Sequence, residues 1–178
     1  MPRRSFVLAS TLFAAAFLAF ACSSPSSPAG GGGGGGNSPD VCAPYATPAG
    51  FDLTTPKVSF KGDVLPIFEV SCGLSSSCHG TPNGPREFLG SKTVTSDPTT
   101  ILAGIVGVAS ADLPAMSFVK AGDDQNSFLM HKIDGDECTL NAQCGGNCGV
   151  SMPQDSPLLP VASRDVVRRW IAQGALNN

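Results

Sequence analysis

The sequence predicts a small, mostly α-helical domain behind a secretory signal and a flexible tether. Four short segments carry apolar residues at helical spacing, long irregular stretches connect them, and no segment alternates convincingly as a strand. With 178 residues, 42% hydrophobic and 14% charged, the chain is long enough for one domain. We therefore expect about four short helices with long loops in residues 51–178, preceded by a disordered glycine-rich tether.

Residues 1–21 predict a signal peptide. Arg3 and Arg4 form a basic start, an apolar run begins at Phe6, and the run is short for a membrane span. The segment LAFAC, which ends at Cys22, resembles the lipobox of bacterial lipoproteins, although Ala19 stands where leucine is commonest. We expect Cys22 to be lipidated and to anchor the chain in a membrane. The alternative is ordinary secretion, with Cys22 as a spare thiol.

Residues 22–50 form the predicted linker. They are rich in Ser, Pro and Gly and include seven consecutive glycines, Gly30 to Gly36, so they cannot bury a core. The roughly 18 residues that follow Cys22 give a flexible tether with a reach of about 25 Å. The domain is therefore expected to sit off a membrane surface.

Charge and cysteine content narrow the function classes. Removal of the signal leaves nine Lys and Arg against 14 acids, a net charge of −5, and no basic cluster predicts a nucleic-acid partner. Seven cysteines in an exported chain indicate an oxidising compartment, where thiols end in disulfides or bonded to a cofactor.

The first two helices are predicted from their apolar spacing. In KGDVLPIFEVSC we expect a helix over residues 64–71, with Asp63 as its N-cap and Pro66 tolerated in the first turn. The segment TTILAGIVGVAS, residues 99–110, is expected to be a buried helix that Gly104 and Gly107 weaken.

Two further helices are predicted in the second half of the chain. In DQNSFLMHKIDG, Asn126 or Ser127 can cap a helix that Gly135 closes. The last segment, SRDVVRRWIAQGALNN, has Ser163 as its expected N-cap, a stripe of apolar residues on one face and Gly174 as its expected C-cap; the stripe consists of Val166, Val167, Trp170 and Ile171. About 120 residues with so many loops bury only a thin core, so a staple such as a haem or disulfides is expected.

The segment VSCGLSSSCHG contains the residues that are expected to bind a cofactor. Covalent haem attachment uses two thiols and an imidazole, usually spaced C-x-x-C-H, whereas Cys72, Cys78 and His79 are spaced C-x(5)-C-H. Either three residues loop out and both thiols attach, or Ser75 stands at the first cysteine position and Cys78 forms a single thioether. Two other interpretations remain open: Cys72 pairs in a disulfide and no haem binds, or the three residues form a metal site, which export disfavours.

The order of these segments resembles a class I-type c-type cytochrome domain of exported bacterial proteins. The resemblance covers residues 58–178 and is carried by DVLPIF before the cysteine motif, by GDDQNSFLMHKIDG, and most specifically by MPQDSPLLPVASRDVVRRWIAQGALNN. It implies a cytochrome c-like fold with one haem c, His79 as the proximal iron ligand and Met152 as the distal ligand. His131 is the rival sixth ligand, although it is more simply a surface residue, and Met116 and Met130 are expected to fill core space.

The remaining cysteines leave haem binding undecided, because their number is even with or without two thioethers. The glycine-rich segment CTLNAQCGGNCGV is expected to be a loop pinned by disulfides beside Met152, with Cys42 tying the tether to it. The pairing among Cys42, Cys138, Cys144 and Cys148 is left open.

These observations predict a lipid-anchored electron-transfer protein rather than an enzyme. It would lie in the bacterial cell envelope, facing the periplasm or the exterior, and exchange electrons with a redox partner protein there. The alternative is a haem-free lipoprotein that keeps the cytochrome fold, is stapled by disulfides and acts as a binding or structural module.

Overall fold

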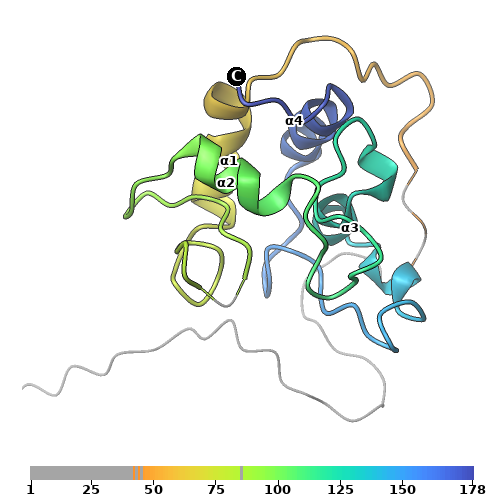
Figure 1. Cartoon of the computed structure of the whole chain (residues 1–178). Coiled ribbons are helices and arrows are strands. Elements are labelled where there is room, and N and C mark those ends of the chain that lie inside the picture. Colours follow the sequence, from red (N-terminus) through yellow and green to blue (C-terminus); the bar gives the residue numbers. More distant parts are fainter. Residues whose placement is uncertain (1–41, 43, 45, 85) are drawn as a thin grey trace, which may run out of the picture.

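The computed structural model describes residues 42, 44, 46–84 and 86–178. Within them the protein is mostly helical, without a strand, as the sequence predicts (Figure 1). The α-helices are α1 (Leu65–Ser71), α2 (Pro98–Ile105), α3 (Phe128–Asp134) and α4 (Val161–Ala172), accompanied by a π-helical turn η1 (Phe60–Val64) and 3₁₀ turns η2 (Asp124–Asn126) and η3 (Glu137–Leu140). The predicted signal peptide, Cys22 and most of the tether lie outside the described residues.

The first helix begins differently from the prediction. Ser59, not Asp63, is the capping residue, because its hydroxyl accepts a hydrogen bond from the Gly62 amide and the chain then enters η1 before α1. Pro66 lies in the first turn of α1, as expected, where its missing N–H leaves no helical bond unmade.

Helix α2 ends earlier than the apolar pattern indicates. Asp97 caps its start through the amides of Thr99 and Thr100, and the helix stops at Ile105. Gly107 takes a left-handed conformation (φ 72°), and Val106 and Ala109 on either side of it pair with residues 117–119 instead of continuing the helix. The prediction of a helix through residue 110 is therefore wrong, because an apolar run alone does not distinguish a helix from a buried extended segment.

Helix α3 agrees with the prediction. Its N-cap position is Ser127, and Gly135 closes it in the left-handed conformation, with φ 78°. Its buried residues include Met130, which fills core space as expected; Met116 packs partly buried against the same core.

Helix α4 starts three residues before the predicted position. Its N-cap residue is Pro160 rather than Ser163, and its C-cap residue is Gln173, with Gly174 following at φ 103°. Residues Val167, Trp170 and Ile171 are buried, which confirms the predicted apolar stripe.

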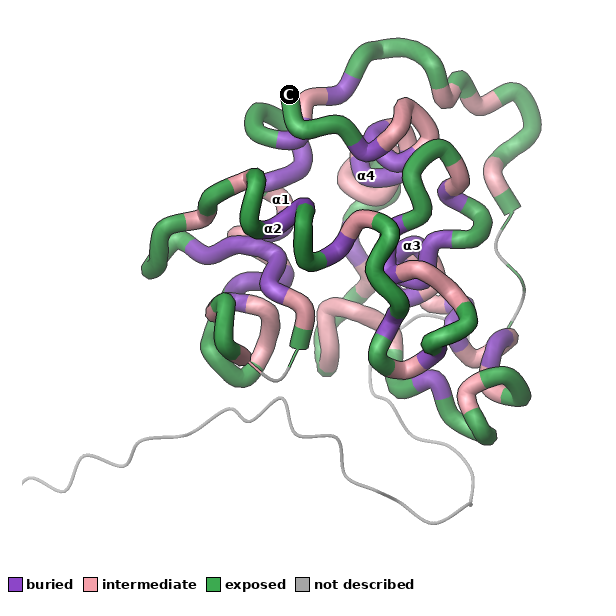
Figure 2. The backbone as a smooth tube through the Cα atoms, in the orientation of Figure 1, coloured by how far each residue is buried: buried purple, intermediate pink, exposed green. Residues whose placement is uncertain are grey.

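An aromatic cluster joins the start of the domain to its end. The ring centroid of Trp170 lies 5.2 Å from that of Phe60 and 6.4 Å from that of Phe68. Nearby, the Phe60 amide donates to the side chain of Asn178, so the C-terminal residue closes on η1. Figure 2 shows buried stretches in the helices and also in a connection, residues 88–91, while most exposed stretches lie in the connections.

A buried ion-pair cluster holds α3 against α4. Asp134, with 1% of its side chain exposed, receives hydrogen bonds from Arg168 (2.8 Å) and Arg164 (2.6 Å). Burying a carboxylate is costly unless cations and hydrogen bonds compensate, and two guanidinium groups supply both. The ion pairs of Asp134 with Arg164 and Arg168 thus hold α3 and α4 together.

The segment before η1 is tied to the domain at two places. A disulfide joins Cys42 to Cys138 in η3, and the side chain of Gln173 bonds the backbone at Leu53, Pro56 and Val58 along α4 (Figure 1). In the described part of the chain no helix has the length and apolarity that crossing a membrane requires.

Candidate functional site

The cysteine motif folds into a closed loop directly after α1. The His79 amide donates to the Cys72 carbonyl (3.2 Å), so the residues between them bulge away from the line of the chain. Within the bulge the amides of Cys78 and Gly80 both donate to the Ser75 carbonyl, at 3.2 and 3.0 Å. The extra residues of the C-x(5)-C-H spacing are therefore accommodated by a loop, as the loop-tolerant sequence predicts.

Glycine is required where this loop packs against its neighbours. A Cβ atom added to Gly73 would lie 1.9 Å from the Gly90 carbonyl oxygen, and one added to Gly80 would lie 2.7 Å from the carbonyl oxygens of Gly73 and Ser75. The backbone of the loop at Gly73 thus packs directly against the backbone at Gly90.

The two cysteines of the motif differ in chemical state. Cys72 is a free, buried thiol, and burial raises its pKa to about 12, so it is not a reactive thiolate. Cys78 is disulfide-bonded, and the Ser75 hydroxyl donates to its sulfur at 3.3 Å. The interpretation in which Cys72 forms a disulfide is therefore wrong in this structure.

His79 is held by the backbone that follows it. Its Nδ1 lies 2.7 Å from the Glu87 carbonyl oxygen, which accepts only if that nitrogen carries the proton. Burial lowers the pKa of His79, with the Glu87 carbonyl opposing the shift, so the ring is neutral at physiological pH. A neutral imidazole protonated at Nδ1 presents the Nε2 lone pair, which is the form that coordinates a metal.

Met152 lies in a second segment that packs on α3. Its amide donates to the Lys132 carbonyl at 2.7 Å, and the Lys132 ammonium donates to the Cys148 carbonyl, also at 2.7 Å. A second disulfide, Cys144–Cys148, closes the preceding loop. The expectation of a disulfide-pinned loop beside Met152, with Cys42 tied to it, is confirmed by these two bridges.

A chain of charged residues links the two segments. Arg86, adjacent to the Glu87 that holds His79, lies 3.4 Å from Asp112, and Asp112 lies 3.8 Å from the Lys132 ammonium. Through these contacts the structure connects His79 to the Met152 segment. Sequence reasoning missed Asp112 and Lys132, because a lone Asp in a loop and a Lys on a helix carry no signal beyond that of a surface charge.

His131 is engaged at both ring nitrogens. Nδ1 lies 2.9 Å from the Asp136 carboxylate and Nε2 lies 3.2 Å from the Gln125 carbonyl oxygen. Burial lowers the pKa of His131, but the hydrogen bond and charge of Asp136 more than offset this, so the pKa is raised. Both ring nitrogens of His131 are thus engaged within the fold, where they tie α3 to the residues on either side of it.

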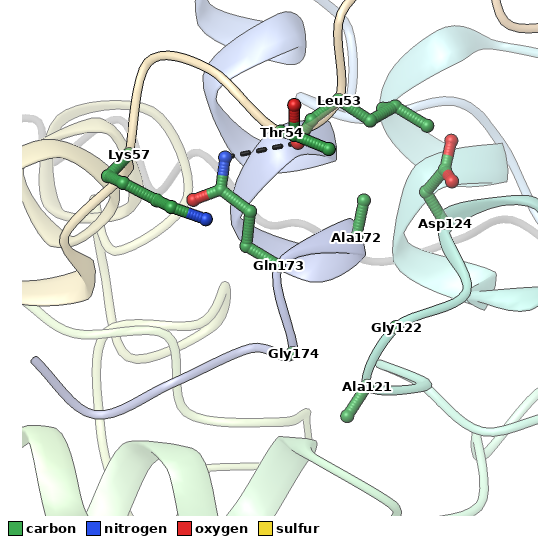
Figure 3. A pocket seen from close by; sticks show the side chains of 9 residues that line it. All are labelled: Leu53, Thr54, Lys57, Ala121, Gly122, Asp124, Ala172, Gln173 and Gly174. Carbon is green, nitrogen blue, oxygen red and sulfur yellow. Dashed lines mark hydrogen bonds between the residues drawn. The ribbon is translucent and has the colours of Figure 1, made fainter.

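A cleft with a volume of about 470 Å³ lies away from this site. Figure 3 shows Lys57, Asp124 and Gln173 at its rim, near the crossing of the N-terminal segment over α4. The amide of Gln173 already bonds the backbone at Leu53, and the Asp124 carboxylate accepts from Thr47. Gln173 and Asp124 in this cleft therefore make hydrogen bonds that hold the fold.

Among the described residues no group of three or more His, Cys, Asp and Glu side chains is arranged to hold a metal ion. No protein-family model, curated protein or solved structure matches the chain.

Proposed function

We propose that this protein is a haem-binding electron-transfer protein in which His79 and Met152 are the axial ligands. The observation that carries the proposal is the hydrogen bond from His79 Nδ1 to the Glu87 carbonyl oxygen. Histidines that ligate metals generally donate their other ring nitrogen to a carbonyl or carboxylate, which fixes the tautomer and the orientation of the ring. The contrast with His131, whose two nitrogens are both used, supports the choice of His79.

The proposed iron ligands, His79 and Met152, fit a haem better than the proposed attachment residues, Cys72 and Cys78, do. Bound haem would supply an iron that takes up and releases one electron, and ligation by a histidine and a methionine favours a high potential. The chain itself provides a neutral imidazole and a thioether held by backbone bonds. The free thiol of Cys72 is compatible with one thioether, whereas a thioether at Cys78 requires its disulfide to be reduced first.

The test is expression of the full chain in an exporting bacterium that has the cytochrome c maturation proteins. A mass increase of one haem that survives denaturation is expected, and the α-band of the pyridine haemochrome distinguishes one thioether from two. Cys72→Ser and Cys78→Ser identify the attached sulfur. His79→Ala is expected to abolish haem binding, while His131→Ala retains it; equal retention in both variants contradicts the assignment of His79.

A second candidate function is that of a haem-free binding or structural module. The bridges Cys42–Cys138 and Cys144–Cys148 favour it, because disulfides then replace a cofactor as the staple of a thin core. It predicts protein without haem and with Cys72 as a thiol that reacts with an alkylating reagent only after unfolding. That result would overturn the electron-transfer proposal.

Membrane anchoring belongs to the same proposal and rests on the sequence of residues 1–22. Cys22→Ser in the full chain is expected to move the protein from the membrane fraction to the soluble fraction and to remove the mass of the acyl chains. A wild-type protein that is soluble and unacylated would contradict lipid anchoring without affecting the haem proposal.

A further inference from the structure

Lys132 is an unusual lysine, because only 7% of its side chain is exposed although it lies on a short helix. Lysine is rarely buried unless its charge is compensated. Burial lowers the pKa of the Lys132 ammonium, and the carboxylates of Glu137 and Asp112 oppose that shift. The Phe128 ring, with its centroid 5.5 Å from the ammonium nitrogen, completes the surroundings.

This one residue holds the Met152 segment at both of its ends. The ammonium donates to the Cys148 carbonyl oxygen, and four residues later the Met152 amide donates to the Lys132 carbonyl oxygen; both distances are 2.7 Å. The second bond also satisfies a carbonyl in the last turn of α3, where helices lack internal donors. The segment from Cys148 to Met152 is therefore clamped against α3.

Gly149 is matched to this clamp. A Cβ atom at Gly149 would lie 2.8 Å from the Lys132 ammonium nitrogen, and the backbone there is left-handed, with φ 81°. A residue with a side chain would be strained at this position and would press on the lysine. The loop thus leaves room for the lysine head group to reach the backbone.

We propose that Lys132 is the positioning residue for the Met152 ligand. Its ammonium fixes the Cys148 end of the segment, and its contact with Asp112 joins that segment to the Arg86 and Glu87 region that orients His79. The consequence for the haem rests on the proposed function above, whereas the clamp itself is a property of the chain with or without haem.

The first test uses the full chain and hydrogen exchange, which reports on the clamp in either state. Lys132→Gln removes the ammonium but keeps the backbone carbonyl, so exchange of the amides from Gly149 to Met152 is expected to become about tenfold faster or more. Lys132→Arg is expected to restore much of the protection. Lys120→Gln, at a lysine with 53% of its side chain exposed, is the control and is expected to leave these amides unchanged.

The second test uses the haem-loaded chain. Lys132→Gln is expected to weaken the sulfur-to-iron charge-transfer absorption and to lower the reduction potential, whereas Lys120→Gln changes neither. Unchanged exchange in Lys132→Gln would overturn the clamp, and faster exchange with an intact charge-transfer band would overturn the link to Met152 ligation. If wild-type protein carries no haem, the proposed function fails, while the exchange result still decides the clamp.

Discussion

The Nδ1 atom of His131 lies 2.9 Å from the Asp136 carboxylate across the C-terminal end of α3. Because the pKa of His131 is raised in the folded protein, folding favours its protonated form. The stabilisation is fully present below the unfolded pKa, near 6.5, and is lost as the pH rises through the higher folded value.

His131→Gln is therefore expected to destabilise the protein more at pH 5 than at pH 9. At low pH the free energy of unfolding is expected to fall by about 1 kcal/mol more than at high pH. This is the difference between a hydrogen bond to a charged group and one between neutral groups. Urea unfolding of both proteins across this pH range is the measurement. Asp136→Asn is the control and should remove the same pH dependence; a constant difference between wild type and His131→Gln would show that the pair does not titrate.

Gly73→Ala is expected to be strongly destabilising, by about 3 kcal/mol or more, because the added Cβ would lie 1.9 Å from a backbone oxygen that cannot move independently. Gly104→Ala is the matched control. Gly104 lies within α2 with no atom within 4 Å of the added Cβ, so alanine is expected to stabilise the helix by about 0.5–1 kcal/mol. Destabilisation by Gly73→Ala together with stabilisation by Gly104→Ala in thermal unfolding would support the close packing of the loop. Small effects of both substitutions would contradict it.

The two described disulfides are expected to differ in their contribution to stability. The Cys42–Cys138 bridge spans 96 residues and the Cys144–Cys148 bridge spans four. Loop-closure entropy then gives about 4.7 kcal/mol for the first and about 2 kcal/mol for the second.

Paired serine substitutions test this order. Replacing Cys42 and Cys138 together is expected to lower the free energy of unfolding more than replacing Cys144 and Cys148 together, as measured by denaturant titration. A larger loss from the short bridge would mean that its local geometry matters more than chain entropy.

Asp134→Ala is expected to destabilise the domain by about 3–5 kcal/mol, because it removes the carboxylate that accepts two hydrogen bonds from the buried Arg168 guanidinium. Asp165→Ala removes a carboxylate that is more exposed and contacts the same arginine from within α4, so a smaller loss is expected. Thermal unfolding of the two variants is the comparison, and equal losses would mean that Asp134 does not carry the contact between the helices.

The sequence by itself determined the helical character of the domain and the positions of its chemistry. The apolar stripe of α4 and the glycine that ends α3 depend on local spacing and backbone preference, so they could be predicted. Local signals also placed the loop after Cys72 and the disulfide-rich segment near Met152. They misplaced the start of α4. They also predicted a second helix that was too long, because Gly107 and the pairing with residues 117–119 decide where α2 stops.

Only the tertiary structure decided which partners surround the side chains of the candidate site. The C-x(5)-C-H spacing distinguishes His79 from His131 along the chain, but the hydrogen-bond partners of the two rings depend on the fold. The fold brings the Glu87 carbonyl to Nδ1 of His79 and brings Asp136 and Gln125 to the two ring nitrogens of His131. Likewise Lys132 becomes the clamp of the Met152 segment only because folding brings the Cys148 carbonyl to its ammonium, a contact between residues 16 positions apart that no local pattern encodes.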